Sequence, residues 1–315
     1  HSNTFNDNSS DSGSESGSDE EALRAGLRGG LNRQSQGICS QYMMINHRQL
    51  VLWWRKNAQR ALFLGVVAFA AVLLACMDKY ICPTPVWLPD PYLNLQTALA
   101  LMQTVYCLGI FGDDKNVFWR ESASGMSVLA FFVSRVTLNT VDLVMQSFVF
   151  SALYFMILQP QILFGNFFLP FLLVSFVAAG AGYFISSILP SQHGPFVASL
   201  VAFVSCGLLG HPMRVMQMMD GGVMEAVMDM SSITRWSVGM SFLVAVETEG
   251  LPPIDTLPVE QRQQLAALIP TYKDKGMWQG LGYWHSGTIW LLTMAAVLHA
   301  AAFLGLKYTN RTKQI

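Results

Sequence analysis

The stretch NVFWRESASGMSVLAFF, residues 116–132, decides how the rest of the chain is interpreted. It places Trp119 and an Arg–Glu pair, Arg120 and Glu121, together with the small residue Gly125, between two long apolar segments. A bare connection between two helices would need only a few residues. We therefore expect a short helix here that lies outside the membrane and presents an aromatic and charged surface for docking.

The composition around this stretch is that of a membrane protein. Of the 315 residues, 52% are hydrophobic and only 12% are charged, and the mean hydropathy is +0.37. A soluble domain carries about 25% charged residues. The net charge of -1 hides an acidic start that is rich in Ser and Gly. Residues 1–40 are predicted to be a disordered linker, because they cannot bury enough apolar surface to offset the entropy lost on ordering.

Six apolar segments predict an all-α membrane protein with six transmembrane helices, since a helix needs about 20 mainly apolar residues to cross a bilayer. These segments are residues 61–77, 93–111, 137–158, 163–188, 195–209 and 287–306. The fifth is short by strict counting. The predicted domains are a cytoplasmic connecting helix at 41–60, a six-span membrane domain at 61–309 and a cytoplasmic tail at 310–315.

The positions of the basic residues predict the orientation. They gather before the first span, between spans two and three, and after span six, and they are Arg48, Arg55, Lys56, Arg60, Lys115, Arg120, Arg135, Lys307, Arg311 and Lys313. Because Lys and Arg near span ends stay on the cytoplasmic side, both termini are expected to be cytoplasmic, in the plasma membrane or an endomembrane. The long loop at 210–285 is then external. We expect it to contain re-entrant helices shielded by protein and an amphipathic helix at 258–270.

Two features of the spans and the loop invite a chemical interpretation. Seven methionines between Met213 and Met230 could bind copper(I), which soft thioethers select. Flexible methionines that fill irregular gaps are the favoured alternative, and no metal site is expected. Asp142 lies inside the third span, where an ionised group costs at least about 2.5 kcal/mol at the bilayer centre. We expect it to snorkel toward the cytoplasmic end rather than to act in a proton relay.

The motif WRESASGM at 119–126, followed by AFF at 130–132, resembles the coupling-helix motif of the G-subfamily (white-type) ABC half-transporters, and most of all its plant-like branch. Arg48 with Arg-Lys-Asn at 55–57 resembles the connecting helix of that family. Cys-Gly-Leu-Leu at 206–209 resembles its Ser-Gly-Leu-Leu element.

A looser likeness to the external region of that family lies in ITRWSVGMSFLVAVE at 233–247. The resemblance covers about residues 40–310. The order of the family's elements agrees with that of the six spans predicted from hydropathy.

The resemblance implies roles for particular residues. Coupling to a nucleotide-binding domain would involve Arg48, Trp119, Arg120, Glu121 and Gly125, with Arg48 paired to Glu121. A substrate cavity on the axis of a dimer would be lined by Met102, Gln103, Tyr106, Leu200, Phe203 and Val204. A di-leucine valve that separates an inner from an outer cavity would consist of Leu208 and Leu209.

The sequence contains neither a Gly-x4-Gly-Lys-Ser/Thr phosphate loop nor an LSGGQ signature, so no ATPase site and no cofactor are expected in this chain. The resemblance implies that ATP and Mg bind a nucleotide-binding domain ahead of His1 or in a separate subunit. The full-length protein would then be an ATP-hydrolysing translocase.

The expected partners are the lipid bilayer, a second half-transporter in a homo- or heterodimer, and a lipid or hydrophobic small-molecule substrate, but no nucleic acid. The expected function is ATP-driven export of lipid-like or amphipathic molecules by alternating access. The alternatives are a channel or carrier independent of an ATPase, for which an inverted repeat would be expected, and a membrane scaffold that does not transport.

Overall fold

The structure is a computed structural model. It describes residues 37–81, 88–112, 115–123, 125–189, 192–211, 227, 230–249, 259, 263, 265–266, 269–270, 272 and 282–308. All regular elements within these ranges are helices. Nearly all of the predicted linker at 1–40, most of the methionine-rich segment and most of the amphipathic helix predicted at 258–270 lie outside the described residues.

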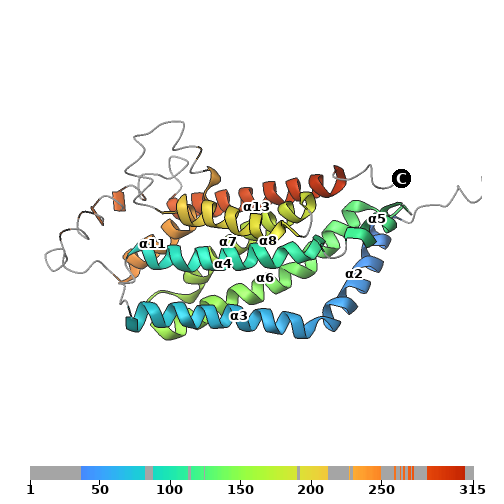
Figure 1. Cartoon of the computed structure of the whole chain (residues 1–315). Coiled ribbons are helices and arrows are strands. Elements are labelled where there is room, and N and C mark those ends of the chain that lie inside the picture. The colour runs from blue at the N-terminus through green and yellow to red at the C-terminus, as the bar shows by residue number, and fades with distance from the viewer. Residues whose placement is uncertain are drawn as a thin grey trace, which may run out of the picture.

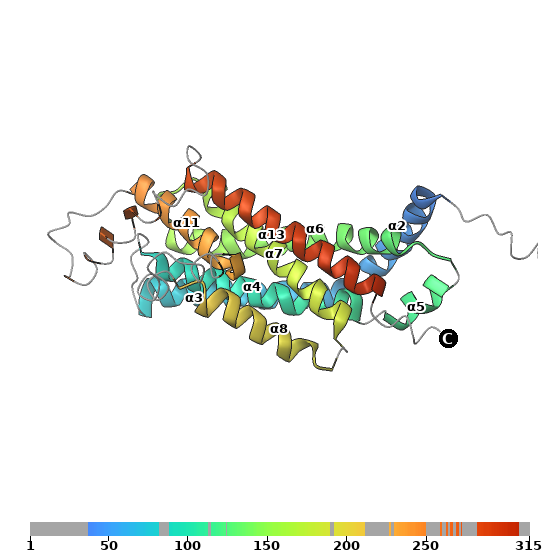
Figure 2. The same ribbon diagram turned by 90° about the horizontal axis from the view of Figure 1, so that it is seen from above.

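Long helices run side by side and form an elongated bundle (Figures 1 and 2). Its helices are α3 (Asn57–Cys76), α4 (Pro89–Gly112), α6 (Val128–Leu158), α7 (Phe164–Ile188), α8 (Gly194–Ala202) and α13 (Tyr283–Tyr308). Two π-helical turns extend these helices: η1 (Met77–Ile81) follows α3, and η2 (Phe203–Leu208) follows α8. Three further helices lie at the ends of the bundle: α2 (Ile38–Arg55), α5 (Lys115–Ala123) and α11 (Thr234–Glu249).

Five of the six predicted spans form helices that are long and apolar enough to cross a membrane: α3 with η1, α4, α6, α7 and α13. The prediction of a sixth span at 195–209 is not met in full. The helix there, Gly194–Leu208, has nine α-helical and six π-helical residues and is about 22 Å long at 1.5 Å per residue. The hydrocarbon core is about 30 Å thick, so this helix is shorter than a full span.

Two predicted boundaries also shift. The connecting helix α2 ends at Arg55 rather than at 60, because Lys56 leaves helical geometry with ψ of 17° and the chain bends there into α3 (Figure 1). Helix α6 begins at Val128 rather than at 137. Its first residues, VLAFFV at 128–133, are apolar, and Ser134 and Arg135 separate them from the span predicted at 137–158. The charged residue therefore made the sequence prediction start too late.

Helix α7 is the centre of the bundle and packs against α4, α6, α11 and α13. The reason is its run of small residues, Ala-Ala-Gly-Ala-Gly at 178–182, which are all buried. A Cβ atom on Gly182 would lie 2.6 Å from the carbonyl oxygen of Thr104 on α4, and one on Gly180 would lie 2.9 Å from the His299 ring on α13. Small residues let helix backbones approach closely in membranes, where dispersion contacts and hydrogen bonds replace the hydrophobic effect.

Helix α11 closes one end of the bundle. Its residues from Thr234 to Ala245 are buried, apart from the half-buried Val244. The helix lies in the loop for which the sequence predicted re-entrant helices shielded by protein. Gln96 of α4 donates to the hydroxyl of Ser241 at 3.0 Å and accepts from the hydroxyl of Ser237 at 2.5 Å. The buried amide therefore ties α4 to α11 through both of its polar atoms.

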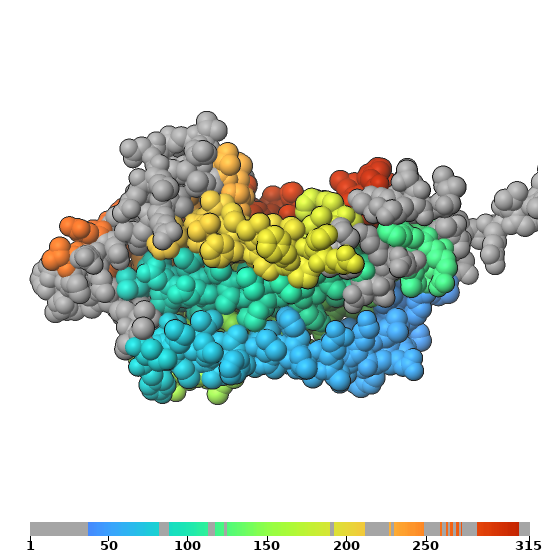
Figure 3. Space-filling view, in the orientation of Figure 1, coloured from blue at the N-terminus to red at the C-terminus, as the bar shows by residue number. Residues whose placement is uncertain are grey.

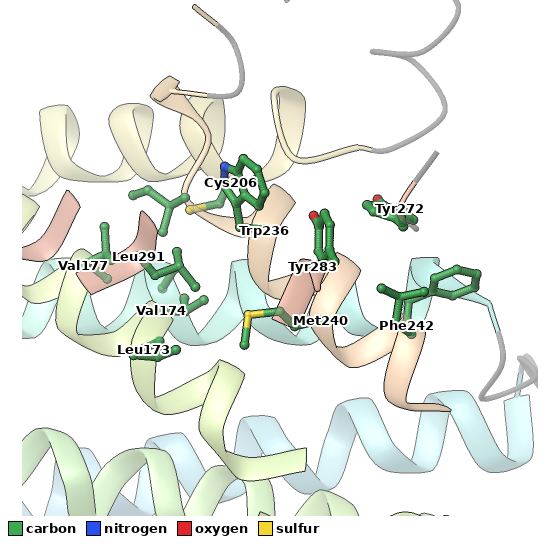
Figure 4. Close-up of a cluster of buried hydrophobic side chains, with 14 of the residues drawn as sticks. Leu173, Val174, Val177, Cys206, Trp236, Met240, Phe242, Tyr272, Tyr283 and Leu291 are labelled. Atoms are coloured by element: carbon green, nitrogen blue, oxygen red, sulfur yellow. The ribbon is translucent and has the colours of Figure 1, made fainter. Parts of the chain in front are cut away.

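The π-helical turn η2 is bound to the start of α11. The hydroxyl of Thr234 donates to the carbonyl oxygen of Cys206 at 2.7 Å, and the amide of Ile233 donates to that of Ser205 at 3.3 Å. A π-turn shifts the helical hydrogen bonds by one residue, and these donors supplement it. Figure 4 shows Cys206 near Trp236, within the apolar cluster that also contains Met240 and Tyr283.

Substituting Gly182 by Ala tests the close packing of α7. We expect the free energy of unfolding to fall by about 1–3 kcal/mol, the usual cost of overpacking, because the contacted atom is a backbone carbonyl that cannot move aside. Gly165→Ala is the control on the same helix, because a Cβ atom there would meet nothing within 4 Å. Thermal unfolding in detergent micelles would measure both variants, and equal stabilities would contradict the packing argument.

Candidate functional site

Helices α2 and α5 lie together at one end of the bundle (Figure 1). Helix α5 is anchored there by Phe118, which is 2% exposed and packs on Phe131 of α6 with ring centroids 4.8 Å apart. Trp119 is half-buried against the same apolar cluster, whereas Arg120 is exposed. The helix therefore has one face fixed to α6 and carries a charged group on another.

Arg48 of α2 and Glu121 of α5 form a bidentate ion pair, with Nη1–Oε1 and Nη2–Oε2 distances of 2.5 and 2.8 Å. The side chain of Arg48 is 47% exposed and that of Glu121 is 23% exposed. An exposed pair of this kind contributes at most about 1 kcal/mol to stability. The amide of Ser127 also donates to the side-chain oxygen of Gln41 at 2.8 Å, so α2 contacts both ends of the α5–α6 connection.

Gly125 produces the turn between α5 and α6. Its φ of 96° lies in the left-handed region, which residues with a Cβ atom rarely adopt. The amides of Gly125 and Met126 donate to the carbonyl oxygens of Ser122 and Glu121, at 3.1 and 3.2 Å. Glycine at this position is the usual helix C-cap, and here it lets α5 fold back beside the start of α6.

Asp142 of α6 lies at the centre of a polar cluster to which α2, α3, α4 and α6 contribute. Its carboxylate accepts from Arg60 of α3, whose Nε lies 2.9 and 3.0 Å from the two oxygens, and a third contact joins Arg60 Nη2 to Oδ1. The Trp53 indole donates to it at 3.0 Å and the Tyr106 hydroxyl at 3.1 Å. Arg60 also lies over the Trp53 ring, 3.5 Å from its centroid.

This cluster corrects the expectation that Asp142 snorkels. The side chain is 6% exposed. Its charge is balanced by that of Arg60 inside the protein, and the carboxylate does not reach water. No local pattern in the sequence identifies Arg60 and Trp53 as partners of Asp142, because both lie more than 80 residues from it along the chain. One signal in the sequence could have indicated the pair: Arg60 lies in the first turn of α3, where its side chain can reach into the bundle.

The residues predicted to line a substrate cavity occupy two different environments. Gln103 is fully buried, and Tyr106 points toward α3 and α6, where it packs on Phe63 with centroids 4.5 Å apart. Met102 is half-buried on the same helix. The remaining predicted residues, Leu200, Phe203 and Val204, are exposed on α8 and η2. Helix α4 packs against α8 and η2, but Gln103 is buried inside the bundle whereas the α8 and η2 residues are exposed.

The two residues of the predicted valve lie at the end of η2. Leu208 is 43% exposed and Leu209 is half-buried. The amide of Leu209 donates to the carbonyl oxygen of Val204 at 3.0 Å, an i to i−5 bond that closes the π-turn. The turn thus holds the two leucines on the last, non-α-helical part of the α8 segment.

The sequence profile described as ABC-2 type transporter matches residues 24–248 of this chain. Because the match covers more than half of the chain, the protein belongs to the ABC-2 type transporter family of membrane domains. It is a multi-pass membrane protein of a transport family.

Curated relatives are similar at low identity. The ABC transporter G family member 25 of Oryza sativa subsp. japonica is 24% identical over 153 residues, 49% of this chain and 15% of that protein. The putative white-brown complex homolog protein 30 of Arabidopsis thaliana is 24% identical over 107 residues, 34% of this chain and 10% of that protein. The ABC-type transporter claG of Penicillium crustosum is 31% identical over 100 residues, 32% of this chain and 14% of that protein. The matched part spans 15% or less of each relative.

Removing Arg60 tests the polar cluster. Arg60→Ala should lower the free energy of unfolding by about 3–5 kcal/mol, because it leaves a buried carboxylate without its cation. The double variant Arg60→Leu with Asp142→Leu should be markedly more stable than the single variant, since no buried charge remains. Arg55→Ala, which removes an exposed arginine nearby, is the control. Equal losses for Arg60→Ala and Arg55→Ala in denaturant titrations would disprove the buried pair.

Proposed function

We propose that the chain is the membrane domain of an ATP-driven half-transporter that exports lipid-like or amphipathic molecules by alternating access. The observation that carries the proposal is the Arg48–Glu121 pair, together with the packing of Phe118 of α5 on Phe131 of α6. These contacts make α2, α5 and the start of α6 one mechanical unit. Arg120 is exposed beside the Arg48–Glu121 pair, and this charged surface would face a nucleotide-binding domain in the same polypeptide or in a separate subunit.

The proposed orientation has this end of the bundle in the cytoplasm. Helices α3 and α6 begin here, and α4 and α13 end here (Figures 1 and 2). The described basic residues near these helix ends are Arg48, Arg55, Lys56, Arg60, Arg120, Arg135 and Lys307. Basic residues near the ends of spans are retained on the cytoplasmic side, so the charge pattern supports cytoplasmic termini in the plasma membrane or an endomembrane.

Force applied to α5 would reach the spans by two routes. The first is direct, through the Phe118–Phe131 contact and the short Gly125 turn into α6. The second passes from α6 to α3 through the Asp142–Arg60 pair. The nucleotide-binding domain would bind ATP together with Mg, and hydrolysis of the ATP would supply the force.

The described residues contain no cluster of three or more His, Cys, Asp or Glu that could hold a metal ion.

The pathway requires a second copy or a related half-transporter. The exposed apolar face of α8 and η2, with Leu200, Phe203 and Val204, supports a cavity that two bundles form between them. Apolar walls with few polar groups suit a hydrophobic ligand. Met102 is the α4 residue of the predicted set that can join this lining, because Gln103 and Tyr106 face the inside of one bundle.

Charge reversal tests the coupling role in the full-length protein or in a complex with the ATPase subunit. Arg48→Glu should lower transport per ATP hydrolysed by roughly 5- to 150-fold, the range of typical coupling free energies. Combining it with Glu121→Arg should restore transport. The unfolding free energy should change by no more than about 1 kcal/mol. Vesicle transport and ATPase assays would measure the ratio, and normal coupling in both single reversals would refute the proposal.

The valve proposal has its own test. Replacing Leu208 and Leu209 together by Ala should raise substrate leakage in the absence of ATP, because two large apolar side chains no longer close the path. Leu62→Ala, a truncation of a leucine that is 70% exposed on α3, should leave the leak unchanged. Flux from substrate-loaded vesicles would measure it, and a tight membrane in the double variant would count against the valve.

A further inference from the structure

Helices α4 and α6 meet along a face that carries polar groups. Two bonds mark this face: the Tyr106 hydroxyl donates to Asp142 at 3.1 Å, and the Asn139 amide donates to the Cys107 sulfur at 3.3 Å. The two helices run in opposite directions, since α4 ends at the α2 end of the bundle and α6 begins there (Figures 1 and 2). Residues that precede Tyr106 on α4 therefore face residues that follow Asp142 on α6.

Gln103 and Gln146 lie on this face, about one helical turn deeper in the bundle. Because successive residues of an α-helix are turned by about 100°, Gln103 projects between the two α4 residues of these bonds. By the same rule Gln146 projects between the two α6 residues. The rise of about 1.5 Å per residue places Gln103 about 4.5 Å beyond Tyr106 and Gln146 about 6 Å beyond Asp142. The two side-chain amides consequently face each other at nearly the same depth.

The amides on this face are buried with polar atoms left over. Gln103 is 0% exposed, and neither its Nε2 nor its Oε1 has a hydrogen-bond partner in the described structure. The Oε1 of Gln146 and the Oδ1 of Asn139 have no partner there either, and these residues are 3% and 2% exposed. A buried donor or acceptor without a partner retains its full desolvation cost. The face therefore needs a ligand that both donates and accepts hydrogen bonds.

A cavity of about 210 Å³ leads to this face between α2, α3, α4 and α6. In Figure 3 the surface between α3 and α4 is hollowed toward the α2 end. Tyr106, Asn139 and Asp142 lie in the cavity wall, so the cavity ends at the residues that mark the polar face. A water occupies about 30 Å³ in the liquid, and water stays in a buried site that offers polar partners. The cavity therefore has room for several waters next to the unpartnered amides.

From this geometry we propose that water passes from the cavity into the α4–α6 interface, where it bridges the amides of Gln103 and Gln146 and donates to the Oδ1 of Asn139. Water suits the site because it satisfies amide donors and acceptors alike. A water bridge is nearly as favourable as a direct hydrogen bond, and the water can change partners when the helices shift. The interface would thus let α4 slide along α6. Only this use in a transport cycle rests on the proposed function, whereas the hydration does not.

Radiolytic labelling of the chain in lipid nanodiscs tests the hydration, because hydroxyl radicals formed from bound water oxidise the side chains beside it. The chain offers two matched reporters. Cys107 lies on the polar face and Cys206 in the apolar cluster with Met240, and both cysteines are 0% exposed. At equal dose Cys107 should be oxidised faster than Cys206, as measured by mass spectrometry of the peptides. Equal rates, which a direct Gln103–Gln146 bond would give, would overturn the proposal.

Variants locate the water. In Gln103→Leu with Gln146→Leu the oxidation of Cys107 should fall, and the thermal midpoint should stay equal or rise, because apolar groups replace unpartnered amides. Gln96→Leu is the matched control, since both polar atoms of Gln96 bind serines of α11. This variant should lower the midpoint and leave the oxidation of Cys107 unchanged. The proposal is wrong if the double variant keeps the wild-type oxidation, which would confine water to the cavity, or loses as much stability as Gln96→Leu.

Discussion

The absence of water inside the bilayer is the constraint on which this structure depends. A polar group in a spanning helix must find a partner within the protein, because lipid tails cannot supply one. Asp142 therefore binds Arg60 and Gln96 binds two serines of α11, while the π-turn η2 gains donors from Ile233 and Thr234. Each of these bonds joins elements that are distant in sequence, so the pairing of these polar groups also fixes how the helices associate.

Packing works together with this constraint. Helix α7 has no charged residue and holds the bundle by close approach, through its small residues at 178–182, to α4 and α13. The tightest contacts thus lie at the centre of the bundle. The contacts of helix α5 are of a different kind: they include the buried Phe118–Phe131 contact with α6 and the exposed ion pair with α2.

The two ends of the molecule consequently differ in character. At the α11 end, polar bonds are buried and the helices close on one another. At the α2 end, basic residues and exposed aromatic side chains surround a cavity between α3 and α4. Among the described residues, those at the α2 end thus combine exposed charged groups, an exposed tryptophan and a cavity within a short distance.

The sequence by itself determined the helical class, the positions of five spans and the presence of a helix around Glu121, because hydropathy and charge are local properties of the chain. The Arg48–Glu121 pair was implied only by family resemblance, since no local pattern joins residues 73 positions apart. Only the tertiary structure decided that Asp142 is buried against Arg60, that α11 is a buried helix and that Gln103 faces inward. In a low-dielectric interior the partner of a polar group is chosen by which helix faces touch, and this follows from the packing of the whole bundle.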